Sequence, residues 1–212
     1  MQKNSYIAVE GAIGVGKTSL VRLLAEKTDA RLVLEQVENN PFLQDFYKNK
    51  ARYAFPAQIF FLLARFGQQQ EMRATDLFYK KVICDYIFAK DKIFASINLA
   101  ERELYLYNRI SSLLEKDVSK PDLVIYLQAS TETLMQRIRK RGREYERNID
   151  YQYLQNLNEA YSNFFFHYTQ TSLLVVNTDR IDFVKNPKHL EDLAGKIEEP
   201  HIGTEYYVPF VE

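Results

Sequence analysis

A glycine-rich stretch near the N-terminus carries the clearest chemistry in the sequence. Residues 11–18 fit the pattern G-x-x-x-x-G-K-[ST], in which glycines let backbone N–H groups turn inward around a phosphate. Lys17 supplies charge to the phosphates of ATP, and Thr18 offers a hydroxyl to Mg²⁺. A chance match is disfavoured because a strand-like run precedes the pattern and a helix-like run follows it. The predicted nucleotide site consists of Gly11, Ala12, Ile13, Gly14, Val15, Gly16, Lys17 and Thr18.

Two acidic residues stand at the ends of predicted strands. Asp85 ends the run Lys81–Asp85, where an acid can hold Mg²⁺ together with Thr18. Glu35 ends the run Arg31–Glu35, where a carboxylate can orient an attacking hydroxyl and accept its proton. The plainer alternative for either residue is a solvated acid in a turn.

Arginines are dense between residues 137 and 147. Arg137 and Arg141 lie one helical turn apart on the same face, and Gly142 ends the helix before Arg143. Three converging guanidiniums suit a transferring phosphoryl group, whose charge spreads over three oxygens. We therefore expect a lid over the phosphates at about residues 137–147, with a solvated helix face as the alternative.

A helix predicted near residues 58–70 is apolar almost all round, so it should be buried. Gln58, Arg65 and Gln69 nevertheless fall on one stripe of that helix, and buried polar groups need partners. The stripe faces either water or another protein segment, or it faces a ligand with fixed donors and acceptors, such as a nucleobase.

These residues need elements to position them, and the sequence predicts alternating strands and helices. Such alternation indicates an α/β fold with a parallel sheet covered on both faces, and a ligand site at the carboxyl ends of the strands. A helix is expected to start at Pro56, since proline suits a first turn. Helices are expected to fill about residues 92–116. The predicted strands are Tyr6–Glu10, Arg31–Glu35, Lys81–Asp85, Asp122–Leu127 and Leu173–Val176.

Composition limits the possible functions. The 212 residues fit one domain, 1–212, with a C-terminal tail from about residue 199. Lys plus Arg equals Asp plus Glu, 28 each, which argues against a general nucleic-acid binder. A single cysteine, Cys84, cannot form an internal disulfide, and no signal peptide or membrane span is visible. A cytoplasmic protein with neither a nucleic acid nor a membrane as partner is expected.

Over about residues 5–198 the chain resembles the deoxyribonucleoside kinases that act on deoxycytidine, deoxyguanosine and deoxyadenosine. The matching motifs are EGAIGVGKTS, Glu35 followed by VENNPFL, and the arginine pattern R-x-x-x-R-G-R. The resemblance implies a P-loop kinase fold with a five-stranded parallel sheet in the order 2-3-1-4-5, and a homodimer. It implies transfer of the γ-phosphate of ATP to the 5′-hydroxyl of a deoxynucleoside.

The resemblance also implies roles for individual residues. Tyr47 and Glu146 match positions that hold the sugar 3′-hydroxyl, and the segment Arg180–Phe183 resembles the loop that contacts the adenine of ATP, through Asp182 and Phe183. The matching residues for the acceptor's base are Gln58, Arg65, Asp91 and the stacking Phe94.

One position departs from the family. Tyr86 stands where the family has an arginine that holds the acceptor's 5′ end, and a neutral phenol cannot provide that charge. Either Arg65 or Arg52 substitutes, or transfer is tuned differently. The same change leaves Asp85 as an alternative base, although we prefer Glu35.

The chain is therefore expected to be a kinase for a purine deoxynucleoside or deoxycytidine. The Arg65–Asp91 pair favours a base with an exocyclic amine, which thymine lacks. Three small residues near the pocket segments suggest space for a purine: Ala57, Ala89 and Ala95. The alternatives are a nucleoside monophosphate kinase of the thymidylate kinase type and, more remotely, a non-enzymatic nucleotide-dependent switch.

Overall fold

A computed structural model describes residues 5–75 and 80–208. Its strands form one sheet in which every neighbouring pair is parallel, in the order β2-β3-β1-β4-β5-β6. Each strand of the sheet interior is rich in Val, Ile and Leu, as expected where both faces of a sheet are covered. The strands are β1 (Ser5–Glu10), β2 (Arg31–Val33), β3 (Lys81–Cys84), β4 (Leu123–Gln128), β5 (Ser172–Asn177) and β6 (Thr204–Tyr207).

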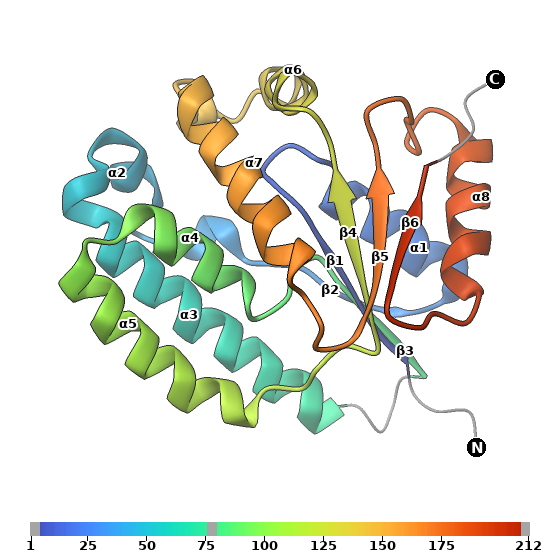
Figure 1. Ribbon diagram of the computed structural model, residues 1–212, viewed down its shortest axis with the longest axis horizontal. Coiled ribbons are helices and arrows are strands. Elements are labelled where there is room, and N and C mark those ends of the chain that lie inside the picture. The colour runs from blue at the N-terminus through green and yellow to red at the C-terminus, as the bar shows by residue number, and fades with distance from the viewer. Residues whose placement is uncertain (1–4, 76–79, 209–212) are drawn as a thin grey trace.

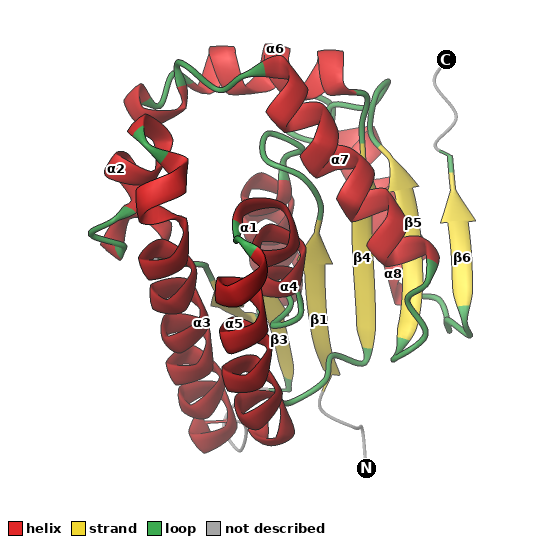
Figure 2. Ribbon diagram, turned by 60° about the vertical axis from the view of Figure 1, so that its left-hand side comes forward, coloured by secondary structure: helices red, strands yellow, loops and turns green. Residues whose placement is uncertain are grey.

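Helices lie on both faces of the sheet, and a group of them extends to one side. In Figure 1, α7 crosses in front of the strands and α1 lies behind them, while α2 to α5 gather on the left. Figure 2 shows α3 and α5 running side by side. The helices are α1 (Lys17–Thr28), α2 (Leu43–Lys48), α3 (Lys50–Thr75), α4 (Lys90–Asn98), α5 (Glu101–Leu114), α6 (Thr131–Arg141), α7 (Tyr151–Phe166) and α8 (Pro187–Glu198), with short 3-10 turns at Val37–Asn39, Glu115–Asp117 and Glu144–Glu146.

The predicted strand order is confirmed for the first five strands, but the count of five is wrong. The segment expected to be a tail from about residue 199 contains β6, which pairs with β5 over Thr204–Tyr207; residues 209–212 of that tail lie outside the described residues. This edge strand has only four residues, and none of them is buried. The backbone N–H of Leu173 donates to Gly203 O at 2.8 Å and begins the pairing.

One predicted helix bound is also wrong. Pro56 lies inside α3, which begins at Lys50, because the Asn49 side chain accepts a hydrogen bond from the Arg52 backbone N–H at 3.2 Å and caps the helix earlier. The helices predicted over about residues 92–116 are α4 and α5. Leu99 is extended between them, and the Glu103 side chain accepts from the Ala100 N–H at 3.1 Å to start α5.

Candidate active site

The glycine-rich stretch links β1 to α1 and packs against the lid helix. Gly14 has φ +89°, and a Cβ there would lie 2.8 Å from the Ile138 side chain of α6, so only glycine fits. Gly16 has φ +107° and lies under the ring of Phe183, where a Cβ would come within 3.1 Å. The loop is therefore closely enclosed by α6 and by the turn after β5.

Lys17 closes this loop on itself. Its ammonium donates to Gly11 O at 2.6 Å and to Ala12 O at 3.2 Å. Burial, followed by the nearby charge of Lys90, lowers the pKa of Lys17 to about 8. An arriving phosphate would offset both effects, since it brings negative charge to the buried ammonium.

The predicted metal residues meet at the carboxyl ends of β1 and β3. The Thr18 hydroxyl donates to one carboxylate oxygen of Asp85 at 2.7 Å, and the Glu35 backbone N–H donates to the other at 2.7 Å. Within residues 5–75 and 80–208, no group of three or more His, Cys, Asp or Glu side chains gathers as a metal cage. A hydroxyl and one carboxylate still fit Mg²⁺, which prefers oxygen ligands and usually keeps waters and substrate phosphates as the rest.

Glu35 lies two residues beyond the end of β2, so its predicted place at the strand terminus is slightly wrong. The change frees its side chain to reach α3 and α4. Arg65 donates to Oε1, through Nε at 2.8 Å and also through Nη2, while Lys90 donates to Oε2 at 2.7 Å. Burial would raise the pKa of Glu35, but Arg65 and Lys90 outweigh burial and hold it well below its usual range. The carboxylate is therefore ionised.

The predicted base-reading residues form one buried cluster beside Glu35. Gln58 donates through Nε2 to Asp91 Oδ1 at 2.6 Å and to its backbone oxygen at 3.0 Å, and Arg65 donates to the same Oδ1. Burial raises the pKa of Asp91 to about 6, against the opposing effect of Arg65. The Tyr107 hydroxyl lies beside the buried Asp91 carboxylate and lowers its pKa, so this acid is surrounded by protein groups.

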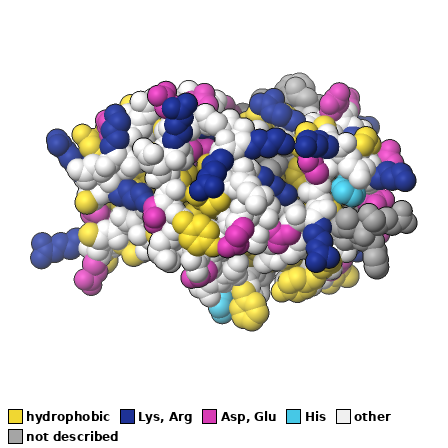
Figure 3. Space-filling model, turned by 90° about the horizontal axis from the view of Figure 1, so that it is seen from above, with side chains coloured by type: hydrophobic (Ala, Val, Ile, Leu, Met, Phe, Trp, Pro, Cys, Tyr) yellow, Lys and Arg dark blue, Asp and Glu magenta, His cyan; other side chains and the backbone are white. Residues whose placement is uncertain are grey.

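The lid arginines have different partners. Arg137 donates to Val15 O at 3.0 Å and to Thr178 O at 2.6 Å, which ties α6 to the phosphate loop and to the end of β5. Arg141 donates through Nε to Glu146 at 3.1 Å, and Arg143 Nη1 lies 3.8 Å from the same carboxylate. Figure 3, which looks down on this end of the molecule, shows Lys and Arg side chains spread across it.

Two cavities adjoin at the phosphate loop. One, of about 350 Å³, lies between the loop, α3, α4 and the lid, and the other, of about 520 Å³, lies between the loop, the lid and the turn after β5. The first contains the predicted residues Ile13, Gly14, Lys17, Thr18, Glu35, Tyr47, Gln58, Arg65, Asp85, Asp91, Phe94, Arg141, Arg143 and Glu146. The second contains Gly14, Val15, Gly16, Lys17, Thr18, Arg137, Arg141, Arg143, Asp182 and Phe183.

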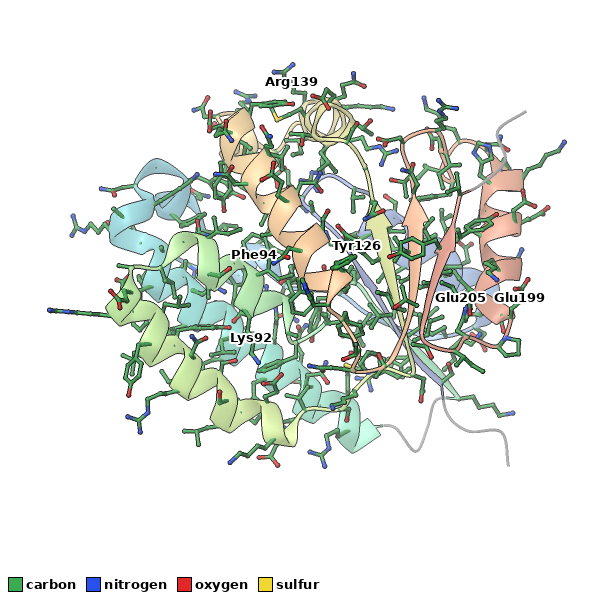
Figure 4. All side chains as sticks on the ribbon, viewed as in Figure 1. Lys92, Phe94, Tyr126, Arg139, Glu199 and Glu205 are labelled. Carbon is green, nitrogen blue, oxygen red and sulfur yellow. The ribbon has the colours of Figure 1, made fainter. Side chains whose placement is uncertain are left out.

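Two smaller corrections concern the first cavity, and Phe94 keeps its predicted place there. The side chain of Tyr86, predicted to meet the acceptor, is fully buried in a separate core cluster with Cys84 and does not line the cavity. Ala57 lines the cavity, but Ala89 and Ala95 do not. The Phe94 ring points between α4 and α7 (Figure 4) and packs edge-on against Tyr161 at a centroid distance of 6.2 Å.

Sequence reasoning missed two charged residues. Lys90 is 5% exposed and donates a hydrogen bond to Glu35; the only sequence signal was a lysine directly after the apolar run Ile87–Ala89. Glu10, which is fully buried, accepts from the Gly11 N–H at 2.9 Å and from the Ile87 N–H at 3.2 Å. It thereby joins the start of the phosphate loop to the segment that leads to Lys90, and nothing in its sequence neighbourhood distinguished it from an ordinary strand-end acid.

Known proteins resemble this chain over nearly its whole length. A sequence model of the family described as deoxynucleoside kinase matches residues 7–202. A deoxyguanosine kinase of Bacillus subtilis is 37% identical over 206 residues, covering 94% of this chain and 99% of that protein. A deoxyadenosine kinase of Dictyostelium discoideum is 36% identical over 165 residues, covering 76% of this chain and 67% of that protein.

Solved structures agree with these relatives. The structure of deoxyadenosine kinase from M. mycoides with bound dATP superposes with a TM-score of 0.79 at 27% identity, covering 92% of this chain and all of that one. The same enzyme with the products dCMP and dCDP gives a TM-score of 0.75 at 28% identity, covering 91% and 98%. The match to the family model over residues 7–202 and the identity to these relatives show that the chain belongs to the deoxynucleoside kinase family.

Proposed function

We propose that this kinase uses ATP with Mg²⁺ to phosphorylate the 5′-hydroxyl of a purine deoxynucleoside, with Glu35 accepting the hydroxyl proton. The observation that supports this proposal best is the position of Glu35. Glu35 lines the first cavity, and its backbone N–H donates to Asp85, which in turn accepts from Thr18, a residue that lines both cavities. A hydroxyl bound in the first cavity would there face a phosphate held by the loop.

The chain's own groups divide the work of transfer. Glu35 orients the hydroxyl and takes its proton, and its firm hold by Arg65 fixes its direction. Lys17 and the lid arginine Arg141 surround the transferring group with positive charge, which stabilises the charge that develops on its oxygens. Mg²⁺, when bound near Thr18 and Asp85, neutralises charge on the phosphates.

The lid closes over both partners of the reaction. Residues 137–147 line both cavities, and closure there would exclude the water that otherwise hydrolyses ATP. Asp182 and Phe183, at the far side of the second cavity, are proposed to hold the adenine of ATP. Tyr47 and Glu146 line the first cavity opposite the base cluster and are proposed to hold the 3′-hydroxyl of the sugar.

The base cluster favours a base with an exocyclic amine. Gln58 and Asp91 line the first cavity, and the Asp91 carboxylate can accept from an exocyclic amine, whereas thymine has the carbonyl oxygen O4 in place of that amine. The two relatives above act on deoxyguanosine and deoxyadenosine by name, and Ala57 leaves room beside the cluster. These points together favour a purine over deoxycytidine.

A four-substrate comparison tests the choice of base. With ATP saturating, kcat/KM is measured for deoxyguanosine, deoxyadenosine, deoxycytidine and thymidine. A purine should be best, and thymidine should be at least about tenfold worse, since an unpaired buried acceptor costs about 1–3 kcal/mol. Thymidine as the best substrate would contradict the role of Asp91, while deoxycytidine as the best would contradict only the preference for purines. Deoxynucleoside monophosphates in the same assay test the thymidylate kinase alternative.

Two substitutions separate the carboxylates. Glu35→Gln should abolish most transfer and leave ATP binding nearly intact, whereas Asp85→Asn should instead weaken the dependence on Mg²⁺. An active Glu35→Gln protein beside an Asp85→Asn protein that is dead at saturating Mg²⁺ would reverse the two roles.

We further propose that the protein is a cytoplasmic homodimer. Large apolar side chains on α5 are open to water, among them Tyr105, Leu106 and Leu113, and Leu63 of the adjacent α3 is 52% exposed. Such a surface is typical of an interface. No helix in the described part of the chain is long and apolar enough to span a bilayer. Sedimentation of the purified protein at micromolar concentration should give twice the mass of one chain, about 50 kDa from the 25.0 kDa of the chain.

A further inference from the structure

Tyr86 leaves a charge missing at the acceptor's 5′ end. The tyrosine follows Asp85 directly, yet its ring is fully buried and packs with Met72, Val82 and Cys84. Neither its position nor its neutral hydroxyl lets it hold a group at the junction of the two cavities. The cation must therefore come from another place in the fold.

Lys90 reaches that place from the first residue of α4. Its side chain is 6% exposed, it lines the first cavity, and its ammonium donates to Oε2 of Glu35 at 2.7 Å. Arg65 holds the other oxygen, Oε1, so the carboxylate is gripped from both sides. Of the two arginines named from the sequence, Arg65 lines the cavity but is already bound to Glu35 and Asp91, and Arg52 does not line the cavity.

Lys90 occupies a position that is usually unfavourable for a lysine. A lysine in the first turn of a helix opposes the positive end of the helix dipole, and a buried ammonium loses its hydration. Two carboxylates offset these costs. Burial would lower the pKa of Lys90, but Glu35 and Glu10 outweigh it and raise the pKa, so the side chain is charged. A residue that is unfavourable for local stability and lines a cavity is expected to have a functional role there.

The path of the chain fixes the position further. Glu10 accepts a hydrogen bond from the Ile87 N–H at 3.2 Å, and the Lys90 N–H donates to Ile87 O at 3.1 Å. The turn that carries Lys90 is thereby anchored to the start of the phosphate loop. A lysine ammonium has three protons, and Glu35 is the one hydrogen-bond acceptor that the described residues provide for them.

We propose that Lys90 is the positioning residue that orients Glu35. Lys90 lies shortly after Tyr86 in the chain and provides the positive charge that Tyr86 cannot provide. The proposal rests on the proposed role of Glu35 as the base. Tyr86 and Lys90 thus divide two roles: the tyrosine fills core space, and the lysine supplies the charge.

Three variants test the charge and its geometry. Lys90→Met removes both the charge and the hydrogen bond, Lys90→Gln keeps a hydrogen-bond donor without charge, and Lys90→Arg keeps the charge. Lys92→Met is the matched control, because Lys92 lies on the same helix but pairs with Glu115 outside the cavity. We expect kcat to fall about 10²-fold in the first two, to stay within about tenfold for Lys90→Arg, and to be unchanged in the control. KM for ATP with Mg²⁺ should change less than about threefold throughout.

A double-substitution comparison asks whether Lys90 acts through Glu35. In a Glu35→Gln background, Lys90→Met should lower kcat less than about threefold further, since the group it positions is already gone. A Lys90→Gln protein within about threefold of wild-type kcat, or a full additional loss of about 10²-fold in the double variant, would overturn the proposal. If Lys90→Met does not fold, comparing Lys90→Gln with Lys90→Arg separates the same two outcomes. An active Glu35→Gln protein would instead contradict the proposed base, independently of Lys90.

Discussion

Arg65 holds two buried carboxylates, and its removal should be among the most costly changes in the chain. Its side chain is 4% exposed; Glu35 is 10% exposed and Asp91 is 1% exposed. The substitution Arg65→Leu preserves much of the apolar volume but leaves Asp91 with only the neutral side chains of Gln58 and Tyr107 as donors, and Glu35 with only Lys90. Both carboxylates would then be buried without enough positive charge and hydrogen bonds to offset the loss of their hydration.

The size of the effect follows from the cost of breaking a buried ion pair. Removing one partner of such a pair costs about 3–5 kcal/mol. For a domain of about 150–250 residues, each kcal/mol lowers Tm by about 2–4 °C, so Arg65→Leu should melt about 6–20 °C below the wild type. Typical domains have about 5–15 kcal/mol of stability, so most of the variant should remain folded at 25 °C.

The pKa of Asp91 determines how the difference in Tm between the variant and the wild type should change with pH. The pKa of Asp91 is about 6 in the folded protein against 3.8 for an ordinary aspartate, so the folded state binds this proton more tightly. The stability that the proton contributes is complete below about pH 4 and is lost as the pH rises through about 6. Without Arg65 the pKa of Asp91 rises further, because Arg65 lowers it. The carboxyl of the variant is then neutral at pH 5.5, and the deficit in Tm should be smaller there than at pH 7.5.

Thermal melts of both proteins at pH 5.5 and 7.5, followed by circular dichroism, provide the test. Arg139→Leu is the control, because Arg139 projects outward from α6 (Figure 4) and a surface substitution should change stability by less than about 0.5 kcal/mol. A Tm within about 3 °C of wild type at pH 7.5, or a larger deficit at pH 5.5, would refute the reasoning about the buried pair.

The phosphate loop and the sugar site give three further tests. Lys17→Ala should lower kcat by about 10²-fold or more, and near-normal turnover in a folded variant would rule out the phosphate-loop mechanism. Because burial and Lys90 lower the pKa of Lys17 to about 8, kcat/KM for ATP should fall as the pH rises through about 8; a flat profile from pH 7 to 9.5 would be inconsistent with a titrating Lys17. Tyr47 and Glu146 should restrict the space at the 2′ position, so that deoxyadenosine exceeds adenosine in kcat/KM and 3′-deoxy analogues are poor; equal values for adenosine and deoxyadenosine would count against this sugar site.

Local sequence was sufficient for the features that depend on short-range rules. The phosphate loop could be predicted because only glycine tolerates the positive φ values at Gly14 and Gly16. The lid helix could be bounded because Ser130 caps its start and Gly142, at φ +71°, ends it. The buried stripe on α3 could be recognised because polar residues on an apolar helix need partners.

The remaining features depend on contacts between residues far apart in the chain. The strand β6 was not predicted, since it has only four residues, none of them buried, and its pairing with β5 supplies the order. The burial of Tyr86 could not be predicted, because its core neighbours come from other elements of the fold. The contact of Lys90 with Glu35 could not be predicted for the same reason.

The sequence alone determined the chemistry of nucleotide binding, because a phosphate loop is defined by backbone conformation and a few adjacent side chains. It also indicated which acids and arginines belong to the site. Only the tertiary structure decided how the charges pair: Lys90, which is 55 residues from Glu35, meets it through the packing of α4 beside the end of β2. Electrostatic partners are set by distance in space, and no spacing along the chain encodes that distance.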